Sequence, residues 1–283
     1  MQLSSVRSLF RARLQALYPE QEIESIFDIA VGHVLNYSKM QLHQNLALNL
    51  SSGSEEHLLK ILDRVSSSEP IQYVTGETEF YSLRFKVDKS VLIPRPETEY
   101  LVDMVIKKYS EIPNLKILDV GTGSGCIAVA LASKLILPEI TAIEKSIIAL
   151  NIASLNASIN HTKVLFIQDD FLNREHDYLQ FNIVISNPPY VTESEKRLMH
   201  RNILEYEPPE ALFVSDSDPL IFYRHLAEFA EKHLFPGGEI FLEINEKYAN
   251  ETATLFVKKG FREVSLHNDL SSKKRYLTAM KKV

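Results

Sequence analysis

The sequence has very little cysteine and no long apolar run. Cys126 is the only cysteine among 283 residues, so no internal disulfide forms, and cysteine-rich zinc or iron–sulfur sites are excluded. No run of 18 apolar residues occurs, which argues against a transmembrane helix. The first residues lack the apolar core and the cleavage site of a signal peptide. We therefore expect a cytoplasmic protein with no membrane partner.

An excess of positive charge is also missing. The chain has 31 Lys and Arg against 37 Asp and Glu, which gives a formal net charge of −6. Proteins that bind nucleic acid usually carry a basic footprint. The charge balance therefore argues against a stable nucleic-acid partner, although a local basic patch is still compatible with it. No two of the nine histidines have the H-x-x-x-H spacing of a metal site, so we expect no metal site.

The residues that are present predict a folded protein of about two domains. Apolar residues make up 45% and charged residues 24% of the chain, as in ordinary globular proteins. Residues 1–70 contain three stretches of apolar residues at helical spacing. Each amphipathic face needs a partner, which predicts a small helical bundle. Pro70 disfavours helix at the residue before it and is expected to close this bundle.

The remainder of the chain has a different pattern. Residues 71–96 predict a β-hairpin linker, because apolar and polar residues alternate over 83–87 and a second apolar run follows at 91–93. Over 97–283, apolar strands alternate with helices, which predicts a mostly parallel sheet covered on both faces. The last two strands have no helix between them and are expected to pair antiparallel.

A glycine loop follows the first strand of this sheet, which we expect at 116–120. The loop consists of Gly121, Thr122, Gly123, Ser124 and Gly125. Its glycines allow a tight turn and let a ligand approach the backbone. Its spacing matches neither a dinucleotide fingerprint nor a P-loop. Asp119 precedes it and fits a ligand with a cationic amino-acid end better than a pyrophosphate. A plain strand-to-helix turn is the alternative.

Acidic and aromatic residues end the next two strands. Glu144 stands where an acid accepts hydrogen bonds from ribose hydroxyls, or it is a solvated strand-end carboxylate. Asp170 and Phe171 offer an acceptor and an aromatic face for an adenine, or they are a turn residue and a core phenylalanine. Together, over about residues 95–283, these elements resemble the class I S-adenosylmethionine-dependent methyltransferases.

This first resemblance implies a fold and a cofactor. The expected fold is α/β, with a Rossmann-like sheet that is mostly parallel, an antiparallel C-terminal strand, and a small all-α N-terminal domain. The expected methyl donor is S-adenosyl-L-methionine, and the product is S-adenosyl-L-homocysteine. No metal ion is expected.

A proline-rich motif ends the fourth strand, where open α/β sheets bind ligands. It reads Ser186-Asn187-Pro188-Pro189-Tyr190. The two prolines stiffen the backbone and remove two donors, so the nearby carbonyls are free to accept. A planar NH2 group would donate to Asn187 Oδ1 and to the Pro188 carbonyl, with its plane against Tyr190. A proline-rich turn is the alternative. The motif resembles the N-P-P-Y signature of methyltransferases that act on adenine N6, cytosine N4 or glutamine amides.

Further motifs indicate which family of methyltransferases the sequence resembles. They are Gln72-Tyr73-Val74-Thr75-Gly76, Ile93-Pro94-Arg95-Pro96-Glu97-Thr98-Glu99 and Tyr206-Glu207-Pro208-Pro209-Glu210-Ala211-Leu212. By its residues alone, the second is a stiff linker with a helix start. In their order, with the glycine loop and N-P-P-Y, the motifs resemble the bacterial peptide chain release factor N5-glutamine methyltransferases (the PrmC/HemK family). The resemblance covers nearly the whole chain.

The family resemblance implies a substrate and a set of site residues. The substrate is the glutamine of the Gly-Gly-Gln motif in class 1 release factors, methylated on its side-chain amide nitrogen. The cofactor residues are Gly121, Thr122, Gly123, Ser124, Gly125, Glu144, Phe171 and Asn187, with Asp170 added by its position. The glutamine residues are Asn187, Pro188, Pro189 and Tyr190, of which Asn187, Pro188 and Tyr190 are expected to be catalytic. Two departures from the family pattern are Glu144, where Asp is common, and Phe171, where some members have Trp.

Other substrates and the role of the bundle stay open at this point. A ribosomal protein glutamine methyltransferase and a nucleic-acid adenine-N6 methyltransferase are the alternatives. A nucleic-acid enzyme predicts a basic face or a target-recognition insert. We expect residues 1–70 to recognise the protein substrate and the chain to act as a monomer.

Overall fold

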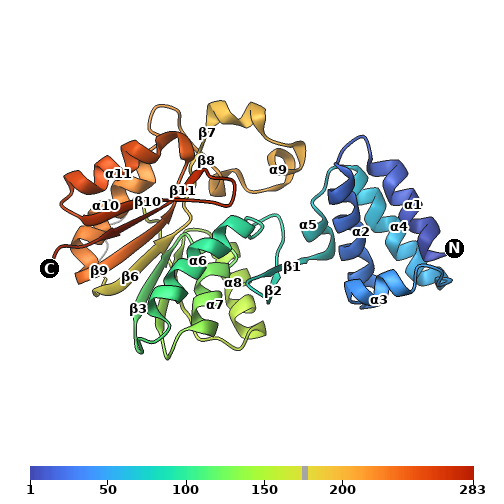
Figure 1. The fold of residues 1–283 in the computed structure, drawn as a ribbon, viewed down its shortest axis with the longest axis horizontal. Coiled ribbons are helices and arrows are strands. Elements are labelled where there is room, and N and C mark those ends of the chain that lie inside the picture. Colours follow the sequence, from blue (N-terminus) through green and yellow to red (C-terminus); the bar gives the residue numbers. More distant parts are fainter. Residues whose placement is uncertain (174–177) are drawn as a thin grey trace. The chain divides into compact units, whose positions relative to one another are not determined.

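The protein consists of two compact units (Figure 1). The computed structural model describes residues 1–173 and 178–283. The first unit comprises Met1–Glu77 and His200–Tyr206, and the second comprises Thr78–Met199 and Glu207–Val283. The helical first unit therefore runs past the boundary expected at residue 70, and it includes a segment from far along the chain.

The first unit is a helical bundle. Its helices are α1 (Leu3–Leu14), α2 (Glu20–Leu35), α3 (Lys39–Gln44), α4 (Ser52–Ser66), α5 (Ile71–Thr75) and α9 (Arg201–Tyr206). The predicted apolar faces pack together, with the buried rings of Phe10 and Phe27 edge to face at 5.4 Å between centroids. Helix α5 begins directly after Pro70, so the chain stays helical where the bundle was expected to end. Pro70 is the N-cap residue: its carbonyl accepts the first hydrogen bonds of α5, from the Tyr73 and Val74 N–H groups, and the N–H that it lacks has no partner within a helix at that position.

A short hairpin follows, earlier in the chain than predicted. Strands β1 (Glu77–Phe80) and β2 (Leu83–Lys86) form a two-stranded sheet. Tyr81 and Ser82 connect them, both with positive φ (52° and 60°), as a type I′ turn requires. Residues 91–93, which were expected to form the second strand, are not in a strand.

The second unit is built on a seven-stranded sheet. Its strands are β3 (Lys116–Val120), β4 (Glu139–Glu144), β5 (Leu165–Gln168), β6 (Phe181–Ser186), β9 (Leu234–Glu243), β10 (Arg262–Asn268) and β11 (Lys274–Met280). Their order is β10-β11-β9-β6-β3-β4-β5. Strand β11 is antiparallel to both neighbours, and the other pairs are parallel. This confirms the predicted mostly parallel sheet with an antiparallel C-terminal strand.

Helices cover both faces of the sheet (Figure 1). Helices α6 (Pro96–Tyr109), α7 (Cys126–Lys134) and α8 (Ile147–Ile159) pack on one face, and α10 (Ile221–His233) and α11 (Ala249–Lys258) on the other. Successive strand residues therefore enter different cores: Ile117 packs with α6 and α7, and Leu118 packs with α10. Burial on both faces explains why these strands are continuously apolar.

Short elements complete the second unit. Strands β7 (Val191–Thr192) and β8 (Phe213–Val214) pair in parallel and were not predicted, because two residues carry no periodic signal. In the two described ranges, no helix is both long enough and apolar enough to span a membrane.

Candidate active site

The glycine loop and the N-P-P-Y motif leave the sheet side by side. Strand β3 lies between β4 and β6, so the chain direction across the sheet reverses at this strand. Val120 pairs with Ser186, and the Ser186 hydroxyl donates to the Val120 carbonyl at 2.7 Å. The residues that follow each strand therefore begin next to each other. Such a switch point is where open α/β sheets bind ligands.

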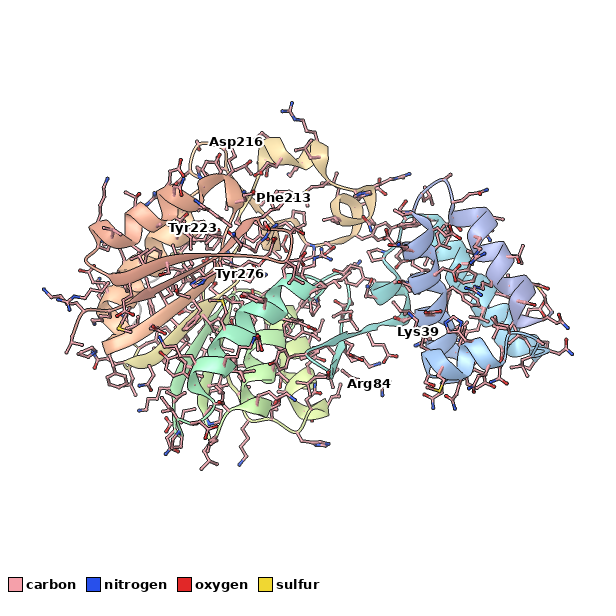
Figure 2. All side chains as sticks on the ribbon, in the orientation of Figure 1. Lys39, Arg84, Phe213, Asp216, Tyr223 and Tyr276 are labelled. Carbon is pink, nitrogen blue, oxygen red and sulfur yellow. The ribbon has the colours of Figure 1, made fainter. Side chains whose placement is uncertain are left out.

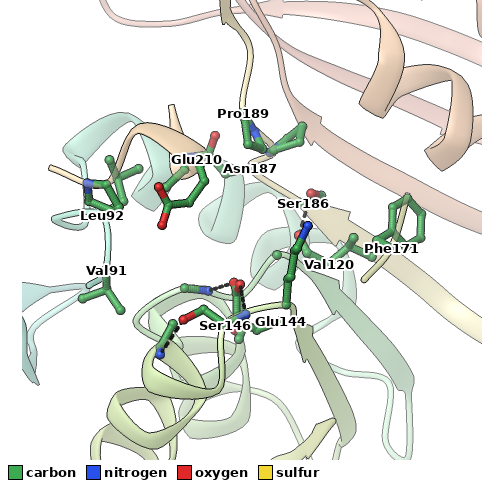
Figure 3. Close-up of a pocket in the computed structure, with 18 of the residues that line it drawn as sticks. Val91, Leu92, Val120, Glu144, Ser146, Phe171, Ser186, Asn187, Pro189 and Glu210 are labelled. Carbon is green, nitrogen blue, oxygen red and sulfur yellow. Dashed lines mark hydrogen bonds between the residues drawn. The ribbon is translucent and has the colours of Figure 1, made fainter. Parts of the chain in front are cut away.

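A cavity of about 860 Å³ lies at this edge of the sheet. Of the predicted site residues, Gly121, Thr122, Gly123, Ser124, Glu144, Asp170, Phe171, Asn187, Pro188 and Pro189 line it. Figure 3 shows Asn187 and Pro189 across open space from Glu144 and Ser146. The volume is in the range of small-molecule sites. Four segments far apart in the sequence thus meet around one cavity.

The glycine loop has the backbone that the sequence suggested. Gly121 and Gly123 have φ of 74° and 53°, in the left-handed region that side chains rarely adopt. Among the described residues, no atom outside the neighbouring positions lies within 4 Å of where a side chain would begin at either glycine. At these two glycines the loop therefore leaves open space beside its backbone, where a ligand can approach. Gly125 instead packs against Ala153 and is not among the described residues that line the cavity.

Glu144 holds the loop in place. Its Oε2 accepts the Gly123 N–H at 3.1 Å, and its Oε1 accepts the Ser146 N–H at 3.0 Å. A carboxylate has about four acceptor directions, so capacity remains for a ligand in the cavity. Glu144 thus has a structural role that the sequence did not suggest. Its contact with ribose hydroxyls stays a prediction.

Asp119 is a buried carboxyl group directly before the loop. Its Oδ2 accepts from the Thr122 hydroxyl at 2.6 Å, whereas its buried Oδ1 has no hydrogen-bond partner among the described residues. Burial raises the pKa of Asp119 to about 7, against the opposing effect of the Thr122 hydrogen bond. Asp119 does not line the cavity, so attraction for a cationic ligand would act through the loop.

Asp170 and Phe171 both line the cavity, and each also contacts other residues of the protein. Asp170 accepts from Asn173 Nδ2 at 2.9 Å and pairs with Lys145 at 2.9 Å, and both contacts lower the pKa of Asp170. Phe171 packs edge to face on the core residue Phe229, with centroids 5.5 Å apart, and also lines the cavity. Phe171 is therefore a core residue and a wall residue at once. Adenine binding by this pair stays a prediction.

Tyr190 is held by a buried acid. It is not among the described residues that line the cavity. Its hydroxyl donates to Glu243 Oε1 at 2.8 Å, and burial together with this carboxylate raises the pKa of Tyr190 well above its usual value. Glu243 thus fixes the position of the Tyr190 hydroxyl. A substrate plane against the Tyr190 ring stays a prediction.

Two residues whose roles the sequence interpretation missed are linked to Asn187 by hydrogen bonds, and one of them, Thr98, also lines the cavity. Asn187 Nδ2 donates to Thr98 Oγ1 at 3.0 Å, and the Thr98 hydroxyl donates to Glu243 Oε2 at 2.8 Å. Thr98 is 2% and Glu243 2% exposed, so both belong to a buried polar network. Glu243 carried a usable signal, because it is an acid within an apolar strand. Such residues usually have a specific partner.

A second buried acid joins two of the family motifs. Glu207 accepts from Arg95 Nη2 at 2.5 Å and from the Ile93 N–H at 3.3 Å. Glu207 begins the segment whose residues Pro208, Glu210 and Phe213 line the cavity. The ion pair therefore ties one wall of the cavity to the start of α6.

Family models match both parts of the chain. The PrmC N-terminal domain matches residues 5–76, and the methyltransferase small domain matches residues 97–212. Among solved structures, a methyltransferase from Pyrococcus furiosus covers 72% of this chain and 91% of its own, with a TM-score of 0.53 and 20% identity. At that identity the likeness shows the fold alone. The family model over residues 97–212, together with this fold, gives the class of the protein, a class I methyltransferase.

Sequence relatives define the family. A release factor glutamine methyltransferase of Flavobacterium psychrophilum is 40% identical over 280 residues, 98% of each chain. Another, from Bacteroides thetaiotaomicron, is 37% identical over 278 residues, which is 98% of this chain and 99% of that protein. The chain belongs to the release factor glutamine methyltransferase family.

Proposed function

We propose that the chain transfers a methyl group from S-adenosyl-L-methionine to the side-chain amide nitrogen (N5) of the Gly-Gly-Gln glutamine in class 1 peptide chain release factors. S-adenosyl-L-homocysteine is the second product. The observation that carries the proposal is the placement of Asn187. Its NH2 group is held by Thr98, and it lines the cavity next to the glycine loop.

The residues of the cavity fit this cofactor. The glycine loop leaves backbone exposed to open space, Glu144 keeps acceptor capacity, and the orphaned Asp119 Oδ1 favours a cationic group nearby. When bound, S-adenosylmethionine supplies a methyl group activated by its sulfonium. We assign the cofactor to the loop, Glu144, Asp170, Phe171 and Asn187, as the family resemblance and the position of Asp170 suggested.

The chain contributes alignment and water exclusion. An amide nitrogen is planar and a poor nucleophile, because its lone pair is delocalised. Asn187 Oδ1 and the Pro188 carbonyl would accept its two hydrogens and fix its plane for an in-line displacement. The N–C bond forms as the C–S bond breaks. Both hydrogen bonds strengthen as positive charge develops on nitrogen. The extra proton leaves to water after transfer, so no strong base is needed beforehand.

Two alternatives are rivals to this proposal. A ribosomal protein glutamine would fit the same amide-binding groups. A nucleic-acid adenine would also fit, but the net charge of −6 disfavours a polyanionic partner. The proposal therefore includes a protein substrate, no stable nucleic-acid partner and a monomeric enzyme.

Labelled cofactor tests the proposal directly. The enzyme is incubated separately with a purified class 1 release factor, with ribosomal proteins and with DNA. We expect label on the release factor alone, on the glutamine of Gly-Gly-Gln by peptide mass analysis. Label on ribosomal protein or DNA, with none on the release factor, would overturn the proposal.

The Asn187→Ala variant is the matched control. We expect no measurable turnover, because the amide acceptor is lost, while cofactor binding stays measurable by calorimetry. Loss of alignment of this kind costs roughly 100-fold or more in rate. Full activity of this variant would contradict the assignment of the amide-binding site.

A further inference from the structure

We infer that Thr98 and Glu243 are positioning residues that set the direction of the Asn187 side chain, with its amide oxygen toward the cavity. The inference deepens the proposed function and rests on it for the role of Asn187 as an acceptor. Thr98 thereby gains a role at the site. The residues of its segment, taken alone, indicated only a stiff linker with a helix start.

Glu243 is the acceptor of the network. Its side chain is buried at the end of β9 and accepts two hydroxyl hydrogens, from Tyr190 on Oε1 and from Thr98 on Oε2, each at 2.8 Å. Burial raises the pKa of Glu243, against the opposing effects of the hydrogen bonds from Tyr190 and Thr98 and of the Arg275 charge. In its ionised form the carboxylate only accepts hydrogen bonds. The single hydroxyl proton of Thr98 then points at Glu243, because the ionised carboxylate has no hydrogen to donate in return.

The direction of the Thr98 hydroxyl then determines the Asn187 amide. With its proton committed to Glu243, Thr98 Oγ1 can only accept from the atom of Asn187 that lies 3.0 Å away. That atom must be Nδ2. The nitrogen and oxygen of an amide are similar in shape, and the hydrogen-bond network distinguishes them. A chain of donors thus runs from Asn187 through Thr98 to Glu243.

The consequence is an acceptor directed to the cavity. Oδ1 projects away from Nδ2 across the amide, and within the described chain no group donates a hydrogen bond to it. A substrate NH2 group can then donate to Oδ1. In the opposite orientation, the NH2 groups of Asn187 and of the substrate would face each other, and neither could accept.

The surrounding backbone makes the network rigid. Tyr276, labelled in Figure 2, pairs with Glu243 across β11 and β9, and its hydroxyl donates to the Glu97 carbonyl at 2.8 Å. Glu97 directly precedes Thr98, so the start of α6 is tied to the strand that carries Glu243. Asn245 Nδ2 donates to the Tyr190 carbonyl at 2.9 Å. Contacts among α6, β9 and β11 therefore hold Thr98 and Glu243 in place, and Asn245 holds Tyr190.

The first test compares two variants at Thr98. Thr98→Val keeps the shape but removes the hydroxyl, so the Asn187 amide loses its fixed direction. We expect kcat to fall about 100-fold and the affinity for S-adenosylhomocysteine to change much less than kcat. Thr98→Ser keeps the hydroxyl, and its kcat should stay within about threefold. Circular dichroism and thermal melting confirm that both variants fold.

The second test reverses the chain of donors. Glu243→Gln offers an NH2 group to Thr98, so the Thr98 proton can turn to Asn187 and bring Nδ2 to the cavity. We expect kcat to fall about tenfold or more. Asn187→Asp alone should have a much lower kcat than wild type, because the new carboxylate and that of Glu243 would then both need a hydrogen from Thr98, which has only one. The double variant Asn187→Asp/Glu243→Gln should regain at least about tenfold over Asn187→Asp, since Thr98 can donate to the new carboxylate.

These measurements use whichever purified substrate accepts label from the wild-type enzyme. A substrate other than a release factor would overturn the proposed function and still test the network. Equal kcat values for Thr98→Val and Thr98→Ser, or no recovery in the double variant, would overturn the inference. Recovery is the readout that a merely structural role of Glu243 would not produce.

Discussion

Buried carboxyl groups hold the polar residues around the cavity. Asp119, Glu207 and Glu243 are each less than 5% exposed, and each accepts at least one hydrogen bond from a residue of the site. A buried charge is costly unless hydrogen bonds or a counter-charge compensate it. These acids therefore have positions and partners that the fold must keep, and single substitutions there have predictable effects.

Gly123 offers a direct test of the cofactor-binding loop. Gly123→Val places a side chain in the open space beside the loop, so cofactor affinity should fall by more than about tenfold, or about 1.4 kcal/mol. Gly260→Val is a matched control, because Gly260 also has positive φ (85°) and open surroundings but does not line the cavity. Calorimetry should find near-normal affinity in the control. Unchanged affinity in a folded Gly123→Val variant would contradict the role of the loop.

Asp119 should make stability depend on pH. Its folded-state pKa of about 7 lies above the ordinary value of 3.8, so between these values the folded protein holds a proton that the unfolded chain has lost. The free energy of unfolding contributed by this group is therefore full below pH 3.8 and falls as the pH rises toward 7. Between about pH 5 and about pH 8, the free energy of unfolding measured with urea should fall less for Asp119→Asn than for wild type. An equal fall in both proteins would remove Asp119 as the cause.

At the scale of elements, the first turn of α6 connects several parts of the second unit. Arg95 pairs with Glu207, the Glu97 carbonyl accepts from Tyr276, and Glu99 Oε1 accepts the Tyr81 N–H at 2.7 Å. Thr98 adds the link to Glu243 described above. A segment whose residues alone indicated only a stiff helix start thus links the hairpin, the sheet and the cavity wall.

The Arg95–Glu207 pair should contribute to stability. Arg95→Ala leaves Glu207 buried without its counter-charge, so the free energy of unfolding should fall by about 2 kcal/mol. Adding Glu207→Gln should recover part of that loss, because the uncompensated charge is removed. Lys107→Ala, in the same helix, breaks the exposed pair with Asp103 and should change stability by less than about 0.5 kcal/mol. Equal effects of Arg95→Ala and Lys107→Ala in denaturant titrations would contradict this role.

At the scale of the whole molecule, we expect the first unit to recognise the protein substrate. The groups assigned to chemistry all belong to the second unit. A Gly-Gly-Gln loop alone offers little contact area, whereas stable protein recognition usually buries about 1,200 to 2,000 Å². The first unit also includes α9, whose Tyr206 hydroxyl donates to the Ser67 carbonyl at 3.0 Å.

Deletion of residues 1–70 should separate recognition from chemistry. The KM for an intact release factor should rise by about tenfold or more, because surface for recognition is lost. A short Gly-Gly-Gln peptide should be methylated equally by the full chain and by the deletion variant. Circular dichroism and cofactor affinity check the fold. An unchanged KM for the intact release factor would show that the first unit has another role.

Local sequence patterns determined much of this protein. The bounds predicted for β3 (Lys116–Val120) agree with the structure, because hydrophobic patterning is a local property. Alternating strands and helices also determined the parallel sheet, and the missing last helix determined its antiparallel strand. The order of strands then brought the glycine loop and Asn187 together, as expected of a switch point.

Only the tertiary structure decided how the side chains at the site are held. It brought three pairs of residues within hydrogen-bond distance: Tyr190 with Glu243, Gly123 of the loop with Glu144, and Asn187 with Thr98. Thr98 and Glu243 are 145 residues apart in the chain, so no periodicity links them. A hydrogen bond depends on distances of a few tenths of an ångström, and those are set by how the helices and strands pack.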